Sequence, residues 1–162
     1  MTVNANEIAH KLREIAPSEN VWFVCIGTDR STGDSLGPMV GTMLKQRGVK
    51  NVIGTLHEPC HAMNMEERLS IIPEDAFVVA IDACLGSTGS IGKVRVKPEP
   101  LRPGAGVNKT LPTVGNACIH GIVNVGGFME YFVLQNTRLS LIMDMAEEIA
   151  AGIEDFAKVV AV

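Results

Sequence analysis

Two aspartates, Asp34 and Asp82, are the side chains of this sequence best placed to do chemistry. Asp34 lies in a short loop between an apolar run at 21–26 and an apolar stripe at helical spacing from Leu36 onward. Asp82 directly follows a second apolar run at 76–81. Because parallel strands end at one edge of a sheet, where open α/β proteins bind their ligands, we expect the two carboxylates to converge.

A convergent carboxylate pair has two chemical uses: it can share a proton between a general base and a general acid, or it can ligate a metal. Each residue also has a purely structural interpretation. Asp34 or Ser35 would cap the helix after the loop, and Asp82 would accept hydrogen bonds from loop amides. The crowding of Asp29 and Arg30 into the same loop favours a functional site, in which these side chains tune the pair or hold substrate.

Histidines extend this set of candidates. His120, in a late apolar run, is a candidate third metal ligand beside Asp34 and Asp82, so a divalent metal is the cofactor that these residues suggest. A second cluster, His57-Glu58-Pro59-Cys60-His61, packs its donors into five residues without a distant partner pair, which is a poor zinc pattern. We assign His61, near the start of a predicted helix, a supporting role in substrate binding.

Composition limits the classes of function. The chain of 162 residues is 46% hydrophobic with a formal charge of -4, which predicts a single α/β domain over 1–162 and no electrostatic footprint for nucleic acid. No apolar run approaches the roughly 20 residues of a membrane helix, and the N-terminal region lacks the apolar core of a signal peptide. The cysteines show no CxxC spacing and fit reduced thiols in a cytoplasmic protein: Cys25, Cys60, Cys84 and Cys118.

The elements that must position these residues alternate along the first half of the chain. We predict helices at 6–15, from Leu36 to about 47 and at 62–72, and strands at 21–26, 49–56 and 76–81. Strand, helix, strand, helix, strand at this spacing implies right-handed parallel crossovers. The expected architecture is a three-layer αβα sandwich around a mostly parallel sheet.

The second half is less regular. The alternation at 91–97, with Lys93, Arg95 and Lys97 on one face, is typical of an edge strand whose charges discourage further pairing. We predict a long loop or flap at 98–112, a strand at 117–125, and a long amphipathic helix at 138–159. The run at 128–135 fits either a strand or a helix, and it could serve a homo-oligomer interface as well as a core.

Several motifs resemble the YyaC sporulation protein family, a domain of unknown function. The main one is Cys-Ile-Gly-Thr-Asp-Arg-Ser-Thr-Gly-Asp-Ser-Leu-Gly-Pro at 25–38. Further matches are Ile-Asp-Ala-Cys-Leu-Gly at 81–86 and Gly-Ile-Val-Asn-Val-Gly-Gly-Phe-Met-Glu-Tyr at 121–131. The likeness extends over 21–153, and it implies a sporulation-associated protein in the cytoplasm of a spore-forming cell or forespore.

That family is similar, more distantly, to spore germination protease and to the maturation proteases of nickel hydrogenases. The segment 32–38 resembles the T-P-D-A-L-G-P-like motif of germination protease, and Ala-Ile-Asp-Ala at 80–83 matches its second acidic motif. The resemblance implies that Asp34 and Asp82 are catalytic acids. In the hydrogenase proteases the equivalent acids and a later histidine bind the nickel of the substrate, with His120 as a weak counterpart here. Both relatives have the three-layer phosphorylase/hydrolase-like fold.

We therefore expect a peptidase acting on a protein or peptide through Asp34 and Asp82. Two alternatives stay open: a non-catalytic sporulation protein that binds a peptide or partner in the same cleft, and a metal-assisted hydrolase related to the hydrogenase maturation proteases.

Overall fold

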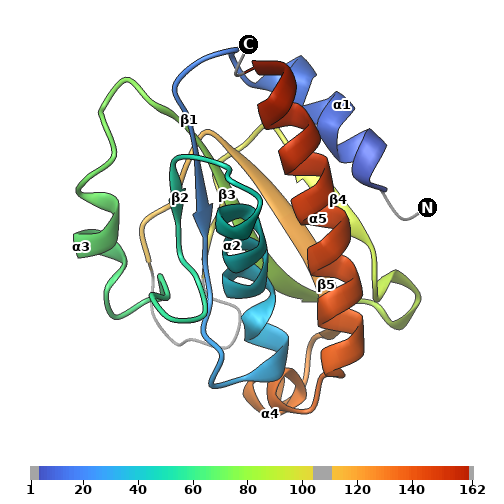
Figure 1. Ribbon diagram of the computed structural model, residues 1–162. Helices are drawn as coiled ribbons and strands as arrows, with labels where there is room; N and C mark the ends of the chain where they lie inside the picture. Colours follow the sequence, from blue (N-terminus) through green and yellow to red (C-terminus); the bar gives the residue numbers. More distant parts are fainter. Residues whose placement is uncertain (1–3, 104–110, 161–162) are drawn as a thin grey trace.

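Five strands form one twisted sheet with helices on both sides (Figure 1). The computed structural model describes residues 4–103 and 111–160. In chain order the elements are α1 (Ala5–Ile15), β1 (Val21–Cys25), η1 (Thr32–Ser35), α2 (Leu36–Gln46), β2 (Val52–Ile53), α3 (Met65–Leu69), β3 (Phe77–Gly86), η2 (Thr88–Ser90), β4 (Val94–Lys97), β5 (Ala117–Val125), α4 (Glu130–Gln135) and α5 (Leu139–Val160).

The strand order is β2-β1-β3-β5-β4, and each neighbouring pair is parallel except β4 and β5. The predicted mostly parallel α/β fold is confirmed, with β4 as the antiparallel edge strand. On β4, Val94 is buried while Arg95 is exposed, as the alternation predicts. Within the described residues, no helix is both long and apolar enough to cross a bilayer.

Two apolar clusters fill the spaces on either side of the sheet. The larger one packs α1, α2 and α5 against one face, where alternate residues such as Phe23, Ile81 and Ile119 point. The smaller one covers the opposite face with α3 and with the segments around Leu101 and Val114. The three layers follow from this division, because both faces of a parallel sheet are apolar and need cover.

Several predicted elements have different bounds in the structure. The strand expected at 49–56 pairs with β1 through Val52 and Ile53 alone, since Gly54 turns the chain away with φ +97°. The helix expected at 62–72 is shortened to Met65–Leu69, because the Asn64 side chain accepts the His61 N–H and holds 61–64 in a turn. The ambiguous run at 128–135 contains helix α4.

The strand predicted at 76–81 is longer than expected, because β3 continues beside β5 as far as Gly86. Strand length here is set by pairing with a neighbour rather than by the length of the apolar run. The base of the predicted flap at 98–112 is closed by paired hydrogen bonds between the backbones of Leu101 and Val114. Residues 104–110 of this flap lie outside the described part of the chain.

Candidate active site

Asp34 is presented by a tight loop that leaves the end of β1. Gly27 takes φ +142°, and a Cβ there would lie 2.0 Å from the Asp34 carbonyl oxygen, so a side chain at this position would displace the loop. The Thr28 N–H donates to that same oxygen at 2.9 Å, and the Asp34 N–H donates to Ser31 O at 3.0 Å. The backbone of Asp34 is therefore fixed from both sides.

Ser35 occupies the N-cap position of α2, as one of the two capping alternatives predicted, but no side chain of this loop caps the helix. Neither η1 nor α2 has a side-chain hydrogen bond at its N-cap position, and the Ser35 hydroxyl donates to Thr32 O at 2.6 Å instead. The turn of 3-10 helix between the loop and α2 explains the difference, since Asp34 belongs to that turn and Ser35 closes it. The carboxylate of Asp34 is thus not used to begin the helix.

Asp82 lies inside β3 rather than after its end, with only 7% of its surface exposed. The structural alternative for this residue assumed that a loop with free amides follows it, but the strand continues beyond Asp82 as far as Gly86. Side chains alternate along a strand, so Asp82 shares the face of Ala80, which is the face covered by α3. Its neighbour in register on β5 is His120.

The structure brings Asp34 and Asp82 into electrostatic contact. Burial raises the pKa of Asp34 to about 7. The pKa of Asp82 is raised well above its ordinary value, first by burial and then by the charge of Asp34. A hydrogen bond from the Ala83 backbone acts in the opposite direction and lowers this pKa. Two carboxyl groups in this state hold a proton near neutral pH, as a general acid and base pair requires.

Asp29 and Arg30 are not brought into this pair. Both residues are exposed, and the Arg30 backbone N–H donates to the Thr28 hydroxyl at 3.3 Å. Burial is the cause of the raised pKa of Asp34, rather than either neighbouring charge. Their predicted role in tuning the pair finds no support here, and a role in holding substrate at the rim stays a prediction.

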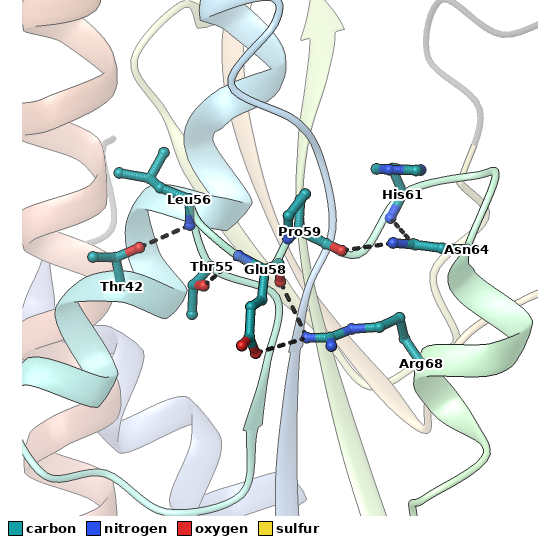
Figure 2. A network of polar contacts seen from close by, with 8 residues as sticks. All are labelled: Thr42, Thr55, Leu56, Glu58, Pro59, His61, Asn64 and Arg68. Atoms are coloured by element: carbon teal, nitrogen blue, oxygen red, sulfur yellow. Dashed lines mark hydrogen bonds and ion pairs between the residues drawn. The ribbon is translucent and has the colours of Figure 1, made fainter.

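His61 is held in a network of polar contacts between β2 and α3 (Figure 2). The Asn64 side chain accepts from His61 N at 2.9 Å and donates to Pro59 O at 2.9 Å, while the Arg68 guanidinium donates to Glu58 O at 3.1 Å. The His61 Nδ1 atom accepts from the Met63 N–H at 3.2 Å, which orients the ring.

This network sits beside the site because Cys60, next to His61, pairs with the end of β1. Ile26 and Cys60 form a parallel bridge, and the Gly27 N–H donates to Cys60 O at 2.9 Å. The loop that carries His61 is therefore attached to the loop that carries Asp34. A supporting role for His61 in substrate binding stays a prediction.

The three proposed metal ligands do not form a coordination group. In residues 4–103 and 111–160, no three histidine, cysteine, aspartate or glutamate side chains lie together in a way that could hold a metal. His120 is the register neighbour of Asp82, but burial and the charge of Lys97 are the main influences on it, and both lower its pKa. The donor set of Asp34, Asp82 and His120 thus does not fit a metal in this arrangement.

Sequence reasoning missed the basic residues beside this site. Arg95 and Lys97 are opposite His120 and Cys118 in the β4–β5 register, so both point to the sheet face that carries Asp82. The signal was present as the alternating charges at 91–97, which we interpreted only as protection of an edge. Their position next to His120 depends on the pairing of β4 with β5, which the alternation does not reveal.

A comparison with solved structures shows which fold class the molecule belongs to. The structure is similar to the crystal structure of a NiFe hydrogenase maturation protease, HycI, from Thermococcus kodakarensis KOD1, with a TM-score of 0.62 over 91% of this chain and 99% of that one. At 21% identity this likeness shows the fold alone. The molecule is an α/β protein with the hydrogenase maturation protease fold.

Within that class, the chain belongs to the DUF1256 family, described as proteins of unknown function, which it matches over residues 2–152. It is 53% identical over 151 residues to the uncharacterized protein YyaC of Bacillus subtilis (strain 168), covering 90% of this chain and 73% of that protein. The resemblance to the YyaC family that we identified from the motifs is confirmed.

Proposed function

We propose that this protein is a peptidase in which Asp34 and Asp82 share a catalytic proton. The observation that carries the proposal is the convergence of a buried strand carboxyl with a second, partly buried carboxyl from a loop 48 positions earlier in the sequence. Two neighbouring carboxyl groups of this kind do not stabilise a core, because the burial of like charges costs free energy. Their presence here therefore supports a functional role.

The pKa values suggest the role of each residue. Asp34, with a pKa of about 7, is the less buried of the two carboxyls and acts as the general base, since ionised Asp34 in turn opposes ionisation of the more buried Asp82. It takes a proton from water as the oxygen attacks the carbonyl carbon of the scissile bond. Asp82 gives its proton to the carbonyl oxygen, so that the tetrahedral carbon carries two hydroxyl groups. As the C–N bond breaks, the proton held by Asp34 passes to the leaving nitrogen. One hydroxyl proton returns to Asp82 as the carbonyl of the product acid re-forms, which restores both side chains to their starting states.

An exposed apolar surface beside the pair supports a peptide substrate. Phe128, Met129, Tyr131 and Phe132, at the start of α4, are all more than half exposed. Helix α4 packs directly on the turn that holds Asp34, since a Cβ added to Gly33 would lie 2.8 Å from the Leu134 side chain. An extended chain crossing the site would place side chains on this surface, where apolar contact contributes to binding.

Cleavage of small acid-soluble spore proteins and of a broad peptide library tests the proposal. These substrates follow from the sporulation setting and cytoplasmic location that we propose on the family resemblance. Asp34→Asn and Asp82→Asn should each reduce kcat/KM by about 100-fold or more. Asp144→Asn, an exposed position on α5, is the matched control and should keep full activity. Undiminished cleavage by folded Asp34→Asn or Asp82→Asn protein would contradict the assignment.

The second candidate is a peptide-binding protein without catalysis, which the exposed aromatic side chains of α4 favour. It predicts no cleavage by the wild type under any condition, together with peptide binding that persists in Asp82→Asn and is lost in Phe132→Ala. Isothermal titration calorimetry on the two variants separates this candidate from the peptidase.

A further inference from the structure

A cavity opens on the same face of the sheet as Asp82, one strand further along. Its volume is about 360 Å³, and it is lined by Lys97, Glu99, Pro100, Arg102, Thr113 and His120. His120 is the register neighbour of Asp82, and adjacent strands lie about 4.8 Å apart. The cavity therefore begins within about two residues of an extended peptide from Asp82.

The charges around this cavity are mostly positive. Two of its lining residues, Lys97 and Arg102, carry a positive charge, and Glu99 is the acidic one among them. Lys97 Nζ lies 3.6 Å from Glu99 Oε1, a loose pair with both side chains substantially exposed. Arg95, opposite His120 in the β4–β5 register, adds a further positive charge at the border.

The state of His120 reflects these surroundings. Burial lowers its pKa first, and the charges of Lys97 and Arg95 lower it further against the opposing effect of Glu99. Burial, together with the positive neighbours, thus keeps the imidazole neutral, and it offers a hydrogen bond rather than another charge. A guanidinium, an ammonium and the Thr113 hydroxyl supply further donors.

We propose that this cavity is a subsite that binds a carboxylate group of the peptide substrate. The carboxylate comes either from an acidic side chain or from the C-terminus of the substrate. This inference rests on the proposed peptidase function for its place in the reaction, while the binding itself is independent of cleavage. The Arg102 guanidinium can donate two parallel hydrogen bonds to the two oxygens of a carboxylate. The Lys97 ammonium can exchange its loose ion pair with Glu99 for one with the bound carboxylate.

Binding of three N-acetylated pentapeptides tests the subsite and identifies the source of the carboxylate. The first has a central Glu and an amidated C-terminus, the second a central Gln and an amidated C-terminus, and the third a central Gln and a free C-terminus. Titration calorimetry is done in the Asp34→Asn background so that the peptides stay intact, because Asp34 does not line the cavity. We expect the first or third peptide to bind at least about tenfold more tightly than the second.

The variants connect this preference to the cavity. Lys97→Gln with Arg102→Gln should remove the preference for a carboxylate while leaving binding of the neutral peptide unchanged. Lys50→Gln removes one positive charge from an exposed residue before β2 and should keep the preference. If the double variant does not fold, Arg102→Gln alone, at an exposed position, should reduce the preference at least about threefold. Equal binding of all three peptides, or a preference unchanged in the folded variants, overturns the subsite.

Cleavage assays on the wild type separate this inference from the proposed function. Selective binding of a carboxylate without cleavage of any peptide would contradict the peptidase and support the subsite. Cleavage that discriminates neither between the Glu and Gln peptides nor between a free and an amidated C-terminus would support the peptidase and contradict the subsite.

Discussion

Asp34 lies close enough to Asp82 for its negative charge to raise the pKa of the buried carboxyl, although the two residues belong to different elements of the fold. Asp34 comes from a turn before α2, and Asp82 comes from the interior of the central strand β3. A pair of this kind affects both the stability of the protein and the pH dependence of any reaction it performs.

The pair should make the protein less stable as the pH rises toward neutrality. The pKa of Asp34 is about 7 in the folded protein against 3.8 for the ordinary side chain, so the folded state binds more protons between these values. The free energy of unfolding therefore falls as the pH rises from about 4 to about 7. Between pH 5 and pH 8, the free energy of unfolding should therefore decrease by about 2 kcal/mol less in Asp34→Asn than in the wild type.

Urea unfolding of the wild type and of Asp34→Asn at both pH values measures this difference. Asp144→Asn should lose as much stability over this range as the wild type, because Asp144 is exposed on α5. The prediction is contradicted if the difference in unfolding free energy between the wild type and Asp34→Asn is the same at pH 8 as at pH 5. Ionisation of Asp34 would then cost the folded state no free energy.

The rate of peptide cleavage should rise with pH around neutrality. The general base must be ionised, so kcat/KM increases as Asp34 loses its proton near pH 7. At higher pH the rate falls again when Asp82, whose pKa is raised well above its ordinary value, also loses its proton. The two apparent pKa values from the pH–rate profile belong to the coupled pair. A profile that declines steadily from pH 5 upward would contradict these roles.

Gly33→Ala should disturb the site by moving the backbone of the neighbouring residue, Asp34. A Cβ at Gly33 would lie 2.8 Å from Leu134 Cδ2 and 2.9 Å from Leu134 O, so the turn carrying Asp34 must move away from α4. Overpacking of this kind costs about 1–3 kcal/mol, and we expect cleavage to fall at least tenfold. Thermal denaturation measures the loss of stability, and kcat/KM measures the loss of cleavage. Gly89→Ala, where an added Cβ has nothing within 4 Å, should change neither one.

Asn64→Ala should loosen the segment that carries His61. The Asn64 side chain makes two hydrogen bonds to the backbone, one from His61 N and one to Pro59 O, both at 2.9 Å (Figure 2). Their loss should lower the free energy of unfolding by about 1–2 kcal/mol and increase hydrogen exchange at 59–64. Met63→Ala is the control, since that side chain is 81% exposed. Equal stability of the two variants would show that the network contributes little.

Much of the fold was predictable because its signals are local. The strand at 117–125 and the helix at 138–159 have the predicted type and nearly the predicted bounds, since long periodic runs leave little choice of structure. Elements whose limits depend on a neighbour were predicted poorly. The end of β3 is set by pairing with β5, and the brevity of β2 by the turn at Gly54.

Residue types and their spacing were enough to predict the alternation of strands and helices, and with it the edge of the sheet at which Asp34 and Asp82 meet. Three features became visible only in the folded chain: Asp34 does not cap α2, Asp82 is buried within a strand, and Lys97 and Arg102 share a cavity with His120. The reason is physical: residue type and periodicity act over a few positions, whereas desolvation and charge proximity depend on contacts between segments far apart in the chain.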